Sequence, residues 1–189
     1  DFALANLPAG LSVTSPQVIQ AMKLVMQVMS AHPGATISFT GHSLGGGLAS
    51  LMSVFFNLNA TTFDAAPFQP TAVNSYLLSA LRSLLAQSGF SNPAFDAYVD
   101  SDGADFPARE SRVTSYFLKG EILEEIRFPW SVIEGDAKPA IDIGTPSILQ
   151  TDSLAARIMA RIELHSMTLL QAAMYSNDFR LGLTQQSQA

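Results

Sequence analysis

The sequence predicts an α/β protein, in which helices flank a parallel β-sheet, and two observations carry this prediction. Apolar residues at helical spacing alternate along the chain with short stretches rich in β-branched and aromatic residues. Because parallel strands need a crossover connection, which is usually a helix, this alternation favours a parallel sheet. The length of 189 residues, of which 48% are apolar, corresponds to one domain with a sizeable core.

The N-terminal half shows this alternation most clearly. Ser15 is a suitable N-cap, Pro16 suits the first helical position, and the triplet His32-Pro33-Gly34 ends this helix. A run with Thr, Ile and Phe then indicates a buried strand, after which helical spacing returns. We expect helices at 15–31 and 44–57 and strands at 35–40 and 60–63.

The C-terminal half contains more irregular stretches. Residues 92–107 carry Pro, Gly and four aspartates, which indicates a loop. The Leu-rich stretch 76–85 is interpreted as core, and an acyl-binding wall or a lid is the alternative. We expect helices at 73–86, 121–127, 153–163 and 166–176, a strand at 113–118, and irregular structure at 129–146.

Charge and residue inventory exclude several function classes. Ten Lys and Arg against sixteen Asp and Glu give a net charge of −6, which disfavours nucleic acid as a partner. The absence of cysteine excludes disulfides, thiolate metal sites and a cysteine nucleophile, and it leaves the compartment open. No uninterrupted apolar run reaches the roughly 18 residues that a membrane span needs.

The segment Gly41-His42-Ser43-Leu44-Gly45 is a G-x-S-x-G pattern between a predicted strand and a predicted helix. This context is typical of a nucleophile elbow, and it separates the motif from a chance match in a Gly- and Ser-containing loop. The turn would hold Ser43 in a strained backbone conformation, and a Cβ at Gly41 or Gly45 would collide with the neighbouring strand or helix. The backbone N–H of Leu44, at the helix N-terminus, could donate to a developing oxyanion.

A serine nucleophile needs a base, and the sequence offers three histidines. His42 lies next to Ser43 in the turn, where its side chain would point away from the hydroxyl. His32 ends a helix on the opposite side of the strand. His165 therefore remains as the candidate base, late in the chain as the order Ser, acid, His requires, with a helix-cap or core histidine as the alternative.

The acid is expected after a strand that lies between Ser43 and His165. Glu121 follows the predicted strand 113–118 and the turn Lys119-Gly120, so its carboxylate could reach the histidine from the carboxyl end of the sheet. Asp64 lies at the end of an earlier strand. As the acid it would give a variant chain order of the triad, and its alternative role is to hydrogen-bond the turn that follows it. The other carboxylates that compete for this role are Glu124, Asp136 and Asp142.

The sequence around Ser43 resembles a known family. Residues 40–49, Thr-Gly-His-Ser-Leu-Gly-Gly-Gly-Leu-Ala, are similar to the nucleophile region of α/β-hydrolase lipases, in particular the class 3 lipase-like group. Residues 62–67 resemble the strand and turn that follow, with Asp64 where Gly is more common. Beyond these residues the resemblance is limited to the order of the site residues along the chain. Glu121 stands where Asp is commoner in the family, and His165 stands where the base is expected. It implies hydrolysis of carboxylic esters of glycerolipids without a metal or organic cofactor.

The same resemblance implies that part of the fold lies upstream. Only 42 residues precede Ser43, whereas an α/β-hydrolase ordinarily places several strands before the elbow. We therefore expect 1–189 to be one domain, the C-terminal part of such a fold without its N-terminal strands. An upstream remainder or a second chain would cover the sheet edge, unless the sheet is unusually small. The other expected partners are a lipid or ester substrate, with transient contact with a lipid surface.

The function predicted from the sequence is that of a serine esterase or lipase. Ser43 would attack the ester, His165 would take the proton, Glu121 would orient the imidazole, and Leu44 N–H would stabilise the oxyanion. Two alternatives stay open at this point. One is a thioesterase or peptidase that uses the same elbow, and the other is a non-catalytic binding module of hydrolase fold.

Overall fold

The computed structural model describes residues 16–124, 149 and 153–176, and its centre is a small parallel sheet. The sheet contains β1 (Ser38–His42), β2 (Asn59–Phe63) and β3 (Val113–Tyr116) in the order β1-β2-β3. Both strand pairs are parallel, with Gly41 opposite Thr62 and Thr62 opposite Ser115. The predicted α/β class with a parallel sheet is therefore confirmed.

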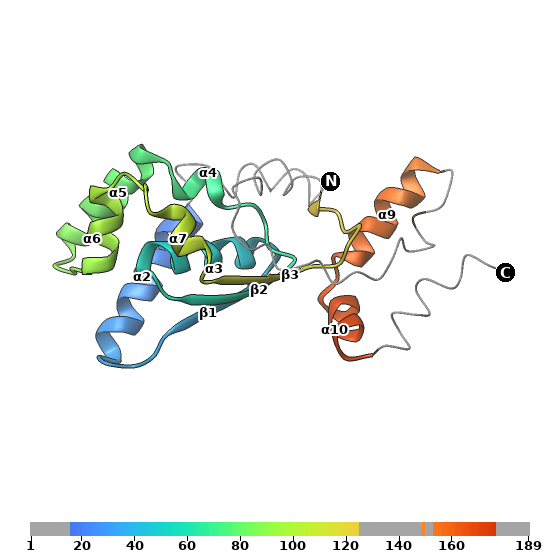
Figure 1. Ribbon diagram of the computed structural model, residues 1–189, viewed down its shortest axis with the longest axis horizontal. Helices are drawn as coiled ribbons and strands as arrows, with labels where there is room; N and C mark the ends of the chain where they lie inside the picture. The colour runs from blue at the N-terminus through green and yellow to red at the C-terminus, as the bar shows by residue number, and fades with distance from the viewer. Residues whose placement is uncertain (1–15, 125–148, 150–152, 177–189) are drawn as a thin grey trace.

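Helices connect the strands and surround them (Figure 1). Helix α3 joins β1 to β2 and packs against both strands. The helices after β3 lie beyond the end of the sheet at which the strands finish. None of the described helices is long and apolar enough to cross a membrane. The described helices are α2 (Pro16–Ala31), α3 (Ser43–Phe56), α4 (Gln69–Ala72), α5 (Ser75–Gln87), α6 (Pro93–Asp100), α7 (Phe106–Glu110), α9 (Leu154–Leu164) and α10 (Met167–Tyr175).

The predicted loop at 92–107 is wrong, because this stretch contains α6 and the start of α7. Its polar and proline residues are helix-start signals. The Asn92 side chain accepts hydrogen bonds from the backbone N–H groups of Ala94 and Phe95, and Pro93 occupies the first helical position. Phe95 and Tyr98 then point into the core at a spacing of one helical turn.

The Leu-rich stretch belongs to the core, as the core interpretation predicts. The predicted helix at 73–86 is observed as α5, which begins at Ser75 because the Asn74 side chain caps it by accepting from Leu77 N–H at 2.9 Å. The observed strand β1 also runs two residues further than predicted, to His42. The structure describes only 121–124 of the predicted helix at 121–127, and the predicted irregular stretch at 129–146 lies outside the described residues.

Two apolar clusters hold the described residues together. The larger one, which we call the main core, joins α2, α3, α5, α6 and α7 and includes Met22, Leu51, Phe55, Leu81 and Phe95. The smaller one, which we call the C-terminal cluster, contains Leu118, Leu164, Leu170 and Ala173, with Phe63 packed against it. The C-terminal cluster thereby attaches α9 and α10 to the chain that leaves β3.

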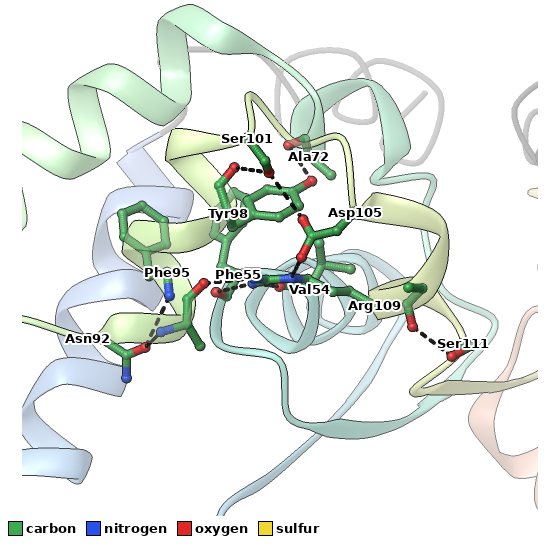
Figure 2. Close-up of polar contacts among 12 residues, drawn as sticks. Val54, Phe55, Ala72, Asn92, Phe95, Tyr98, Ser101, Asp105, Arg109 and Ser111 are labelled. Carbon is green, nitrogen blue, oxygen red and sulfur yellow. Dashed lines mark hydrogen bonds and ion pairs between the residues drawn. The ribbon is translucent and has the colours of Figure 1, made fainter.

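A buried arginine ties the helices of the main core to one another (Figure 2). Arg109, 5% exposed, donates to the carbonyl oxygens of Val54 and Phe55 at the end of α3 and to that of Ala94 in α6. Its Nε donates to Asp105 at 2.6 Å, and its guanidinium lies 4.7 Å from the centre of the Tyr98 ring. One side chain therefore satisfies backbone acceptors of two helices.

Replacing Arg109 with methionine is expected to lower the free energy of unfolding by about 3 kcal/mol, because buried carbonyls and Asp105 lose their donor. The matched control is Arg82→Met. Arg82 forms an ion pair with Asp100 in which both side chains are substantially exposed, so its loss should cost at most about 1 kcal/mol. Urea unfolding midpoints of the two variants measure the difference, and equal losses would contradict this account.

Candidate active site

The turn between β1 and α3 has the backbone of a nucleophile elbow. Strand β1 ends at His42, and Ser43 begins the helix with a φ of 55°, in the left-handed region. A residue other than glycine pays roughly 1–2 kcal/mol to adopt this conformation, so the surrounding structure must hold it there. The strained serine backbone predicted from the motif is confirmed.

The glycines of the motif have different roles. A Cβ on Gly41 would lie 2.3 Å from the carbonyl oxygen of Gly45, so nothing larger than glycine fits at position 41. A Cβ on Gly45 would meet nothing within 4 Å, so the expected collision at that position is wrong. Cβ atoms on Gly46 and Gly47 would lie within 3 Å of the chain after β2, which shows that α3 approaches that chain closely.

Three residues far apart in the chain meet at this turn. The Oγ of Ser43 lies 2.8 Å from Nε2 of His165, and Nδ1 of His165 lies 2.8 Å from Oε2 of Glu121. The structure therefore brings together the serine, the histidine and the first-choice carboxylate that the sequence analysis singled out. Both distances are within the hydrogen-bond range that nucleophile and base require.

Local structure positions the histidine and the carboxylate. His165 is the C-cap of α9, one residue before the N-cap of α10, and its side chain is 14% exposed. Glu121 is fully buried, and its Oε2 also accepts from Leu123 N–H at 2.7 Å. A backbone hydrogen bond from Ile122 N–H to Arg161 O joins the two segments. The imidazole therefore has a buried anion on one side and the serine hydroxyl on the other.

The competing carboxylates make other contacts or lie outside the described residues. Glu124 accepts a hydrogen bond from Gly120 N–H within its own turn. Asp64 is fully buried at the end of β2, and its Oδ1 accepts from Leu118 N–H at 3.1 Å. Asp136 and Asp142 lie outside the described residues. Among the described carboxylates, Glu121 is the one that makes a hydrogen bond to a ring nitrogen of His165.

His42 has a contact that the sequence analysis did not foresee. Its Nε2 lies 2.9 Å from the carbonyl oxygen of His165, and the two ring centres are 4.9 Å apart. Desolvation by partial burial is the main cause that lowers the pKa of His42 below its usual range. The side chain of His42 therefore reaches the main chain of the candidate base.

Two further features bear on the chemistry of the site. Leu44 is in the first turn of α3, where backbone N–H groups have no partner within the helix and can donate to an anion. His42, Asp64 and His165 each offer a metal-ligand atom, and these atoms lie within 4.8 Å of one another. Because both ring nitrogens of His165 already contact Ser43 and Glu121, the present arrangement suits proton transfer better than metal ligation.

Comparisons with known proteins relate this chain to a phospholipase-like family. Residues 1–166 match the family model of the Tle-like phospholipase domain. A segment of 47 residues is 45% identical to a lipase candidate, atg15, of Penicillium rubens, and it covers 25% of this chain and 7% of that protein. No solved structure matches this chain.

Proposed function

This chain belongs to the Tle-like phospholipase domain family, and from that premise we propose that it hydrolyses carboxylic esters of lipids through an acyl-enzyme on Ser43. The observation that carries the proposal is the pair of 2.8 Å contacts from His165 to Ser43 and to Glu121. This arrangement supplies a nucleophile, a base and a group that orients the base. The narrower likeness to class 3 lipases remains a prediction.

The proposed reaction begins with proton transfer within the triad. The buried Glu121 carboxylate accepts from Nδ1–H of His165, which leaves Nε2 unprotonated and able to take the proton of Ser43 Oγ. The oxygen attacks the ester carbonyl, and the Leu44 N–H stabilises the tetrahedral oxyanion. The imidazolium returns its proton to the departing alcohol, which breaks the C–O bond and leaves the acyl group on Ser43.

Hydrolysis of the acyl-enzyme repeats these steps with water. His165 takes a proton from a water molecule, the resulting hydroxide attacks the acyl carbonyl, and the proton passes to Ser43 Oγ as the carboxylic acid departs. The products are an alcohol and a fatty acid. These steps need the serine, the histidine, the carboxylate and water.

The surface of α9 supports a lipid rather than a fully soluble substrate. Its apolar side chains face outward, whereas Leu164 near its end is buried in the C-terminal cluster. The exposed ones are Leu154, Ile158, Met159 and Ile162. The helix ends at Leu164, and its C-cap is His165. Exposed apolar side chains on the helix that leads to the proposed base favour contact with a lipid surface over a thioesterase or peptidase substrate.

A fluorophosphonate probe tests the nucleophile directly. We expect one adduct per molecule, found on Ser43 by peptide mass spectrometry, because the hydroxyl is activated by His165. The Ser43→Ala variant should take up no probe. A folded protein that stays unlabelled would contradict the proposal and favour the non-catalytic module, and so would an adduct on another serine.

The substrate class is tested with a matched series of compounds. Phospholipid esters and p-nitrophenyl esters of rising chain length are compared with an amide and a thioester of the same acyl group. We expect kcat/KM to rise with chain length and to be highest for esters presented in vesicles. Faster turnover of the thioester or amide would replace the lipase proposal with one of the two enzyme alternatives.

A further inference from the structure

The last side chain of β1 contacts the main chain of the proposed base. His42 Nε2 lies 2.9 Å from the carbonyl oxygen of His165, a residue 123 positions further along the chain. A carbonyl oxygen only accepts hydrogen bonds, so Nε2 of His42 carries the proton and donates. The contact therefore joins the residue before the nucleophile to the backbone of the residue that activates it.

The backbone of His165 needs such a contact. His165 occupies the junction of α9 and α10, where its N–H still donates to Arg161 O and Ile162 O and the chain then changes direction. Its imidazole must meet Ser43 and Glu121 at the same time, each at 2.8 Å. The direction of the Cα–Cβ bond depends on the peptide planes on either side, so holding the carbonyl of His165 also holds its ring.

The surroundings of His42 suit a neutral donor. Partial burial is the main cause that lowers the pKa of its imidazole below the usual value, which favours the uncharged ring. A second cation 4.9 Å from the His165 ring would oppose the imidazolium that the proposed reaction forms. In the described part of the chain, the acidic groups that act on the ring are Asp64, whose Oδ2 lies 3.9 Å from Nε2, and Glu121.

We propose that His42 is a positioning residue, which fixes the orientation of His165 by donating a hydrogen bond to its carbonyl oxygen. This inference rests on the proposed function, because it assigns His42 a part in that same reaction. In this role His42 acts through the main chain of His165 and not on the reacting atoms. The turn itself does not require histidine at position 42, and the proposed role gives a reason for this residue.

Three substitutions at position 42 separate the donor from the ring. His42→Phe keeps an aromatic ring and removes the donor. His42→Gln places an amide N–H at nearly the same distance along the side chain as Nε2. His42→Asn keeps an amide, but its side chain is one methylene shorter and cannot reach the carbonyl of His165.

The expected order of activity follows the donor. His42→Phe and His42→Asn should lower kcat by about 10- to 100-fold with KM little changed, since a displacement of about 1 Å can cost roughly 100-fold. His42→Gln should recover kcat to within several-fold of the original protein. The rate of fluorophosphonate labelling should fall and recover in the same order, while urea unfolding midpoints stay close together.

The controls distinguish this inference from the proposed function. If Ser43→Ala keeps full turnover, the proposed function itself fails. If Ser43→Ala is inactive but His42→Phe keeps its kcat, only the positioning role is overturned. Equal losses in Gln and Asn would also overturn it, because the position would then need the imidazole and not a donor at that distance. Should His42→Phe fail to fold, the Gln and Asn pair still decides between these outcomes.

Discussion

Ser43→Ala is expected to lower kcat for a lipid ester by about 10⁶-fold, the size of loss found when the nucleophile of a serine triad is removed. Without the hydroxyl, His165 has no group to deprotonate and no acyl-enzyme can form. Some rate above that of water should remain, since the Leu44 N–H and the binding surface are left in place. Steady-state turnover of phospholipid and p-nitrophenyl esters measures the loss.

The matched control for this variant is Ser50→Ala in the same helix. Ser50 is fully buried and donates to Gly46 O, one turn earlier in α3, so it reports on serine replacement near the site. We expect its kcat to stay within a few-fold of the original value. A Ser43→Ala protein that keeps more than a few per cent of the activity would remove Ser43 from the mechanism.

The second large effect is expected at Glu121, where replacement by glutamine should lower kcat by about 10³- to 10⁴-fold. If the new amide turns its NH₂ toward His165, it fixes the tautomer that cannot take a proton from Ser43. If it turns its oxygen there, the tautomer is kept, but the charge that stabilises the imidazolium is lost. Both orientations slow formation of the acyl-enzyme and its hydrolysis.

Glu124→Gln is the control for Glu121→Gln, because both carboxylates belong to the same short segment. Glu124 accepts from Gly120 N–H, and the oxygen of a glutamine can do the same. We expect this variant to keep its kcat within a few-fold. Comparable losses in the two variants would indicate that the segment as a whole matters, and would remove the specific role of Glu121.

Much of the fold and most of the candidate site follow from local signals in the sequence. The strand-turn-helix around Ser43 is encoded within a dozen residues. Glycine at position 41 and the small residues at the start of the following helix are typical of this turn, because a Cβ at Gly41, Gly46 or Gly47 would collide there. Chain order then reduces the candidates for the base, and the position of Glu121 after a strand reduces the candidates for the acid. These features depend on neighbours in the sequence, so they can be predicted from sequence patterns.

The errors and omissions come from signals with two meanings or from distant contacts. Asn92 and Pro93 mark either a loop or a helix start, and what decides is that Phe95 and Tyr98 find room in the core. The role of His42 depends on where a residue 123 positions away comes to lie, which no local pattern encodes. The expected upstream strands of the sheet stay a prediction.

The two apolar clusters divide the proposed machinery between them. Ser43 begins α3, whose far side is embedded in the main core, whereas Glu121 and His165 are attached through the C-terminal cluster. The hydroxyl and its activating pair are thus held by different clusters, and the 2.8 Å contact between Ser43 and His165 links the two. We therefore expect kcat to depend on how the two clusters pack against each other. A change at their boundary should lower kcat even while each cluster stays folded.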